Sequence, residues 1–209
     1  MPLSRIYYPS KQFSIGLWEI TESLSDLQSA FDTQLFANSI PNNLHDNRKK
    51  ELLAVRCLLY KMLKSPYTIS YDEYGKPMLF TNKQTFPLSI THSKNQVAVA
   101  IHQTLNIGLD LEHQQERLAK LQLKFLNEKE LDFCKKELWK ITLCWSAKET
   151  VYKWYGKKQV DFKKDIHISP FIILPKGSFK TQLILNNQVS PLQIHYVIIN
   201  NFAMTWTVS

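Results

Sequence analysis

Asp110 and Glu112 are two carboxylates whose types and spacing could serve chemistry. They alternate with Ile107, Leu109 and Leu111, which predicts a strand, and residues two apart in a strand point to the same face. The two carboxylates would then project from one face of a strand whose opposite face is apolar. Oxygen ligands of this kind suit a hard divalent cation such as Mg²⁺. The solvated face of an edge strand would produce the same pattern, so the pair alone leaves both interpretations open.

A second pair of charged residues lies in a predicted helix over residues 140–155. Glu149 and Lys153 are four residues apart and therefore share one side of that helix. Glu149 could be a third carboxylate at a metal or a general base, and Lys153 could be a fixed cation for a phosphate. The same spacing is typical of an ordinary surface ion pair. Ser146 and Glu149 also match a capping box, which would place a helix start there.

Candidate phosphate-binding residues precede both pairs. His92 lies between Thr91 and Ser93 in a predicted loop before a strand, and its ring nitrogen and the two hydroxyls could bind a phosphate. A histidine that is merely structural or exposed is the alternative.

A predicted helix over residues 46–64 carries further cations. Its apolar residues recur at helical spacing, and Asp46 is its expected N-cap. Arg48 and Arg56 fall on roughly one side of this helix, and Lys76 follows in a predicted turn. Long basic side chains often only cover surface, so none of the three identifies a site alone.

The elements that position these residues are read from hydrophobic periodicity. The predicted elements after the first helix are a hairpin of strands at 96–102 and 107–112, helices at 127–138 and 140–155, and a closing hairpin of strands at 196–199 and 202–208. This order predicts an α+β fold of two similar-sized halves with mostly antiparallel sheets, residues 1–105 and 106–209.

The composition excludes several classes of protein. Of 209 residues, 44% are hydrophobic and 21% are charged, as in an ordered globular protein. No apolar run reaches the ~18–20 residues of a membrane helix, and the first residues lack the apolar core of a signal peptide. The 3 cysteines show no CxxC spacing, which favours a reducing cytoplasm, and the net charge of +8 favours an anionic partner. No P-loop or GxGxxG turn is present.

Read together and in order, these motifs resemble the 4′-phosphopantetheinyl transferase superfamily, specifically its longer Sfp-type branch. The family signature is a G-[apolar]-D-[apolar]-E strand followed by W-S-x-K-E-x-x-x-K, which here are residues 108–112 and 145–153. The YGKP sequence at 74–77 and the Thr91-His92-Ser93 sequence also match, although Thr91 stands where the family usually has serine. The resemblance runs from about Arg48 to about Ile168.

The resemblance implies a pseudo-dimer of two α+β halves with the active site between them. Its implied activity is transfer of the phosphopantetheine arm of coenzyme A to a serine of a carrier protein, with release of 3′,5′-ADP. By resemblance, the metal ligands for Mg²⁺, or Mn²⁺, are Asp110, Glu112 and Glu149, the pyrophosphate contact is Lys153, and the contacts to the 3′-phosphoadenosine end are Arg48, Arg56, Lys76, Thr91 and His92. Glu149 or a metal-polarised water would be the base, and Glu130 is a secondary acidic candidate.

The expected partners follow from the same resemblance and the charge. A net charge of +8 suits a small acidic acyl or peptidyl carrier protein. We expect coenzyme A as co-substrate, no nucleic-acid or membrane partner, and a cytoplasmic monomer. The alternatives are a basic noncatalytic nucleic-acid-binding domain and an inactive relative of the same fold. The first would need aromatics clustered with cations on one sheet face, a pattern the sequence does not show.

Overall fold

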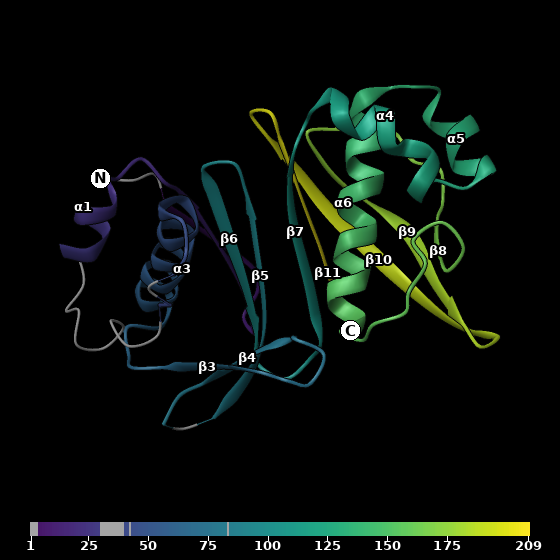
Figure 1. Ribbon diagram of the computed structural model, residues 1–209. Coiled ribbons are helices and arrows are strands. Elements are labelled where there is room, and N and C mark those ends of the chain that lie inside the picture. Colours follow the sequence, from purple (N-terminus) through teal and green to yellow (C-terminus); the bar gives the residue numbers. More distant parts are fainter. Residues whose placement is uncertain (1–3, 30–39, 42, 83) are drawn as a thin grey trace.

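The computed structural model describes residues 4–29, 40–41, 43–82 and 84–209, apart from the side chain of Ser4. The chain forms two antiparallel sheets with helices packed on them, which confirms the predicted α+β class (Figure 1). The strands are β1 (Ser4–Ser10), β2 (Phe13–Glu19), β3 (Thr68–Tyr71), β4 (Pro77–Phe80), β5 (Thr85–Ser93), β6 (Gln96–His102), β7 (Ile107–His113), β8 (Ile166–Ile168), β9 (Lys176–Leu185), β10 (Gln188–Ile199) and β11 (Phe202–Val208). The helices are α1 (Leu24–Ser29), α3 (Asp46–Leu63), α4 (Glu116–Phe125), α5 (Glu128–Cys134) and α6 (Leu138–Tyr155).

The first sheet has six strands in the order β1-β2-β6-β5-β4-β3, and α1 and α3 cover one of its faces. In β6, Val97 and Val99 pack against Leu58 of α3, while Ala98 and Ala100 point to the opposite face. Every residue of β6 is buried, although the alternation of large and small residues resembles that of a half-exposed strand. The opposite face is buried because small alanines let the second sheet approach it.

The second sheet has five strands in the order β7-β11-β10-β9-β8, and α6 packs along one face of β7 and β11. A Cβ at Gly108 would collide with the carbonyl oxygen of Thr150, so α6 can lie this close to β7 only because residue 108 has no side chain. The hydroxyls of Ser146 and Thr150 also bond that of Thr205 in β11, at 2.9 and 2.6 Å. These contacts fix which face of α6 packs against the second sheet.

The two sheets face each other through an apolar layer, so that β7 stands beside β5 and β6 between the two groups of helices (Figure 1). The buried residues of this layer are Phe13, Ile15, Leu17, Ala98, Ala100, Ile107, Leu109, Leu111, Phe202 and Met204. The residues from Ile107 to Leu111 are consequently buried on both faces of β7. The alternative of a solvated edge-strand face is therefore wrong for Asp110.

A row of hydroxyl side chains joins the two sheets at the free edge of β7. β7 is the last strand of its sheet, so its outward N–H groups have no neighbouring strand. Three hydroxyls of β5 accept these hydrogens: Leu109 N to Ser89 Oγ at 3.0 Å, Leu111 N to Thr91 Oγ1 at 3.2 Å, and His113 N to Ser93 Oγ at 3.1 Å. This hydroxyl row, residues 89, 91 and 93, satisfies backbone donors that would otherwise be costly to bury.

Two strand predictions are corrected. The expected hairpin between residues 96–102 and 107–112 does not form, because β6 pairs with β2 and β5 whereas β7 pairs with β11. The Thr91-His92-Ser93 sequence lies in β5 and not in a loop. The closing hairpin is confirmed, since Ile199 pairs with Phe202 across a two-residue turn.

Helix boundaries needed similar corrections. The helix at 46–64 is confirmed, but its N-cap is His45 and not Asp46. Ser146 lies inside α6, so the capping box with Glu149 is wrong, and Asn127 and Glu130 form a capping box at the start of α5 instead. α4 was not predicted. Within the described ranges, no helix is long and apolar enough to cross a membrane.

Candidate active site

Asp110 projects from β7 toward α6, with only 4% of its surface exposed. Its Oδ1 accepts hydrogen bonds from Lys153 Nζ at 2.8 Å and from Thr91 Oγ1 at 3.1 Å. Its Oδ2 is buried and has no hydrogen-bond partner among the described residues. A buried carboxylate oxygen without a partner is rare in a folded protein, and an ordered water or a bound ion would satisfy it.

Two further carboxylates lie near Asp110. Glu112 accepts hydrogen bonds from Gln115 Nε2 at 3.0 Å and Trp145 Nε1 at 3.2 Å, and burial and then the charge of Asp110 raise its pKa above the ordinary value. Glu149 lies one helical turn before Lys153, and burial and then the charge of Asp110 raise its pKa to about 7. Carboxylates gathered in a poorly solvated place repel each other, so protons are held more tightly.

These three carboxylates fit a divalent cation in chemistry, but they are not arranged as a closed set of ligands. In the parts of the chain that the structure describes, no three His, Cys, Asp or Glu side chains already form a metal-binding group. The Lys153 ammonium holds Asp110, and the Trp145 indole holds Glu112. The orphaned Oδ2 and the raised pKa of Glu149 are both conditions that a bound cation would relieve.

Cations line an open cavity of about 260 Å³ between α3, β5 and the end of α6. Its positively charged or basic lining residues are Arg48, Arg56, His92 and Lys153, together with one acid, Glu51. Its lining thus brings together two cations from α3, one imidazole from β5 and the lysine that binds Asp110. An arrangement of this size and charge suits a phosphate-bearing ligand.

Glu51 is the residue of this cavity that the sequence did not identify. Its Oε2 lies 2.8 Å from Arg48 NH1 and 3.4 Å from His92 Nε2. Burial lowers the pKa of His92, and the charge of Glu51 opposes that shift. The available signal was the three-residue spacing of Arg48 and Glu51 on one helix, which is too common to indicate a site.

Lys76 lies beside a neighbouring cavity that Lys153 also lines. Its Nζ donates to the carbonyl oxygen of Trp154 at 2.7 Å and to Asn106 Oδ1 at 3.4 Å, and burial lowers its pKa. The side chain also lies against Gly156, the left-handed residue that ends α6. Lys76 therefore binds the C-terminal end of α6 in this structure, and its contact with coenzyme A stays a prediction.

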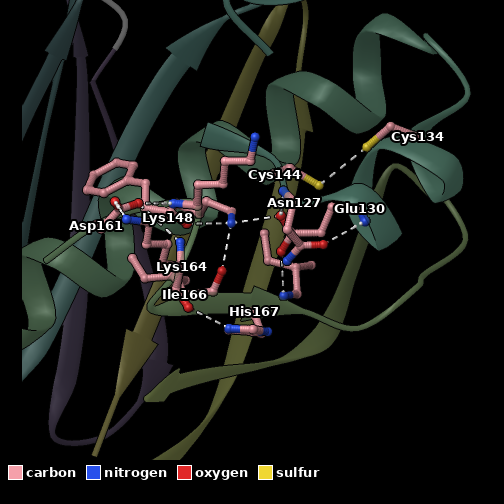
Figure 2. A network of polar contacts seen from close by, with 12 residues as sticks. Asn127, Glu130, Cys134, Cys144, Lys148, Asp161, Lys164, Ile166 and His167 are labelled. Atoms are coloured by element: carbon pink, nitrogen blue, oxygen red, sulfur yellow. Dashed lines mark hydrogen bonds and ion pairs between the residues drawn. The ribbon is translucent and has the colours of Figure 1, made fainter. Parts of the chain in front are cut away.

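Lys148 and Glu130 form a separate network on the other side of α6, inside the second half of the chain. Figure 2 shows Lys148 pointing toward Glu130 and the segment before β8. Lys148 Nζ donates to Glu130 Oε2 at 2.8 Å and to the carbonyl oxygens of Phe162 and Ile166 at 2.7 and 2.6 Å. Glu130 Oε1 accepts from Ile168 N at 2.9 Å. Glu130 is thus occupied in holding α5, α6 and β8 together.

Strand alternation in β5 separates two residues that were assigned to one ligand. His92 pairs with Val97 and points toward α3, where it meets Arg48. Thr91 pairs with Ala98 and points toward β7, where its hydroxyl binds Asp110. The structure thus brings His92 to the cavity and Thr91 to the carboxylates.

Comparison with known proteins bears on the second half of the chain. Residues 106–207 match the family model of the 4′-phosphopantetheinyl transferase superfamily. The matched span contains Asp110, Glu112, Glu149 and Lys153, and it begins after His92. No curated protein matches the chain.

Proposed function

Residues 106–207 match the family model of the 4′-phosphopantetheinyl transferase superfamily, and we propose that the chain transfers the 4′-phosphopantetheine arm of coenzyme A to a serine of an apo carrier protein. The reaction is Mg²⁺-dependent and releases 3′,5′-ADP, and the enzyme is of the Sfp type. The halves 1–105 and 106–209 are proposed as the two units of a pseudo-dimer, with the reaction between them.

The observation that carries this proposal is the position of Lys153. Its ammonium binds Asp110 at 2.8 Å and also lines the cationic cavity with Arg48 and His92. The acidic cluster and the candidate phosphate site therefore meet at one side chain. Coenzyme A has the matching layout, with a 3′-phosphate at one end and a pyrophosphate that contains the bond that breaks.

Recognition of the nucleotide end rests on the residues of the cavity. Arg48 and Arg56 from α3 and His92 from β5 would bind the 3′-phosphate, because guanidinium groups make charge-assisted hydrogen bonds to phosphate oxygens and an imidazole can donate its ring N–H. Lys76 is kept as a further candidate for the same end of the ligand. Lys153 would neutralise charge on the pyrophosphate that adjoins the carboxylates.

The acidic side of the site would hold the cation and take the proton. Asp110, Glu112 and Glu149 are the proposed ligands, and a bound Mg²⁺ would neutralise charge on the pyrophosphate. The carrier serine Oγ forms a bond to the β-phosphorus, and the bond from that phosphorus to the bridging oxygen breaks, so 3′,5′-ADP leaves with the electron pair. Glu149, or a water polarised by the bound cation, is the proposed acceptor of the serine proton, because a carboxylate beside the reacting phosphate can take that proton in the transition state.

The net charge, the cysteines and the placement of the site residues support proposals for the partner, the location and the oligomeric state of the protein. A net charge of +8 favours an acidic acyl or peptidyl carrier protein. Cys57, Cys134 and Cys144 are free and buried, which supports a cytoplasmic location. Residues proposed for both ends of coenzyme A lie within one chain, which supports a monomer, and a light-scattering mass tests this.

The deciding experiment combines the purified protein with coenzyme A, Mg²⁺ and an acidic apo acyl carrier protein, and follows the carrier by mass spectrometry. The expected result is a gain of one phosphopantetheine group that EDTA prevents. Lys153→Met should abolish the gain, and Lys158→Met, on the same segment but outside the cavity linings, is the matched control that should retain it. Failure to modify peptidyl as well as acyl carriers while coenzyme A still binds would favour the inactive relative.

A further inference from the structure

Thr91 has a position in the structure that separates it from the cavity. It is 3% exposed and does not belong to either of the two cavities that Lys153 lines. Its side chain lies between the two sheets, on the side of β5 that faces β7. A ligand in the cationic cavity would meet His92 and not the hydroxyl of Thr91.

The hydrogen bonds of Thr91 fix the direction in which its hydroxyl donates. A threonine hydroxyl has one hydrogen to give and two lone pairs to receive. The Leu111 N–H must be the donor in its 3.2 Å contact with Thr91 Oγ1. The one hydroxyl hydrogen is then available for Asp110 Oδ1, at 3.1 Å.

This donation decides which oxygen of Asp110 remains for a ligand. Oδ1 receives hydrogen bonds from Thr91 on β5 and from Lys153 on α6, so it is held from both sides. Oδ2 is the buried oxygen without a hydrogen-bond partner in the described part of the chain. Rotation of the carboxylate would break both bonds to Oδ1, so Oδ2 is kept in one direction.

We propose that Thr91 is a positioning residue whose hydroxyl orients the Asp110 carboxylate so that Oδ2 is presented to a divalent cation. This inference rests on the proposed function, in which Asp110 is a metal ligand. It replaces the expected contact of Thr91 with the nucleotide end of coenzyme A. It also makes a residue of the first sheet a determinant of metal affinity in the second.

The hydroxyl row contains a natural control. Ser89 is equally buried, at 3%, and accepts the Leu109 N–H at 3.0 Å, as Thr91 accepts the next outward N–H of β7. Its hydrogen bond does not involve Asp110. Ser89→Ala and Thr91→Val therefore both remove a hydroxyl that joins β5 to β7, but only Thr91→Val releases Asp110.

The test is a titration of each purified protein with Mn²⁺ alone, in which electron paramagnetic resonance reports the free ion. Thr91→Val should weaken Mn²⁺ binding about 10-fold to 100-fold, the usual effect of losing a group that orients a metal ligand. Thr91→Ser keeps the hydroxyl and should bind as the wild type does, and Ser89→Ala should stay within about 2-fold of it. Calorimetric affinity for coenzyme A in EDTA should be the same for the wild type, Thr91→Val and Thr91→Ser, because Thr91 lines neither cavity.

Three outcomes overturn the inference. Wild-type Mn²⁺ affinity in Thr91→Val, or an equal loss in Ser89→Ala, would reduce Thr91 to a structural contact. A loss of coenzyme A affinity in EDTA would return Thr91 to the nucleotide site. If Thr91→Val does not fold, Thr91→Ala removes the same hydroxyl and is titrated instead.

Asp110→Asn separates this failure from failure of the proposed function. If Asp110→Asn abolishes Mn²⁺ binding but Thr91→Val does not weaken it, only the role of Thr91 is wrong. If Asp110→Asn binds Mn²⁺ as tightly as the wild type, Asp110 is not a ligand and both proposals fail.

Discussion

Helix α6 carries two lysine–carboxylate pairs that differ in what they leave unsatisfied. Lys148 is fully buried, and its ammonium has three acceptors: Glu130 Oε2 and the carbonyl oxygens of Phe162 and Ile166. Lys153 is 26% exposed, and its hydrogen bond within the described residues goes to Asp110, whose Oδ2 has no hydrogen-bond partner. We call Lys148–Glu130 the closed pair, because all three ammonium hydrogens have acceptors, and Lys153–Asp110 the open pair, because polar atoms of both side chains are left for a ligand.

The difference teaches how one helix can serve stability and chemistry at once. An ammonium group has three hydrogens, so Lys148 has none left for a ligand, whereas Lys153 does. Both lysines lie in the W-S-x-K-E-x-x-x-K sequence, where the motif alone does not distinguish their roles. The predictions below separate the two pairs, from the largest expected effect to the smallest.

Lys148→Met should destabilise the protein by about 3–5 kcal/mol, because removal of one partner leaves the buried Glu130 carboxylate without its counter-charge. The loss is measured as the free energy of unfolding in urea. Adding Glu130→Gln should recover part of it, since the unpaired charge is then gone. A Lys148→Met protein as stable as the wild type would show that the closed pair contributes little to folding.

Asp110→Asn should lower the transfer activity strongly and the stability only slightly, unlike Lys148→Met. Transfer to the carrier should fall at least about 100-fold, or about 2.7 kcal/mol in the barrier. Stability should fall by only about 1 kcal/mol, because the partly exposed Lys153 can turn toward the cavity when its partner is neutral. The mass-spectrometric assay and a urea titration of the same preparation give both values. Near-normal transfer would contradict the assignment of Asp110 as a ligand.

The two segments that carry the open pair were predictable from the sequence because the geometry within each segment is local. Asp110 and Glu112 share a face in any strand, and Glu149 and Lys153 share a side in any helix. The resemblance to a known signature then joined two segments that periodicity alone could not place together. The structure places Lys153 Nζ 2.8 Å from Asp110 Oδ1.

The parts that could not be predicted depend on partners distant in sequence. Nothing near Ile107 indicates that β7 pairs with β11 and not with β6, because either partner would suit its apolar residues. That the side chains of Thr91 and His92 point in opposite directions could be inferred only once residues 85–93 were known to form a strand. The role of Lys148 was hidden for a similar reason, since two of its three acceptors are backbone carbonyls, which carry no residue-type signal.

The crowding of charge at the open pair predicts a stability that depends on pH. Burial and the charges of Asp110 and Glu112 raise the pKa of Glu149 to about 7 from an ordinary value of 4.5, while Lys153 opposes the shift. In the metal-free protein, the contribution of Glu149 to the free energy of unfolding should fall as pH rises from 4.5 to 7, because the folded state holds a proton that the unfolded chain releases.

Glu149→Gln should remove this dependence. The free energy of unfolding of Glu149→Gln should equal that of the wild type at pH 4 and exceed it by about 3 kcal/mol above pH 7. Urea titrations of both proteins in EDTA across this range are the measurement. Curves that stay parallel would show that Glu149 titrates normally. Saturating Mg²⁺ should reduce the difference between the two proteins, because the cation favours the ionised carboxylate.

Lys76 is an intermediate case between the two pairs and carries the smallest expected effect. Its ammonium holds the Trp154 carbonyl at the end of α6, where a cation is favoured by the helix dipole, so Lys76→Met should cost about 1 kcal/mol of stability.

Whether Lys76 also binds ligand is decided by calorimetric affinities for coenzyme A and for its analogue without the 3′-phosphate. If Lys76 only caps α6, the ratio of the two affinities is the same in the variant and the wild type. If Lys76 moves to the 3′-phosphate, the variant loses affinity for coenzyme A alone and the ratio falls toward one. Arg56→Met is the matched control, because Arg56 lines the larger cavity and should lower the ratio in either case. An unchanged ratio in both variants would mean that the 3′-phosphate is bound elsewhere, and the cationic cavity would then lose its assignment.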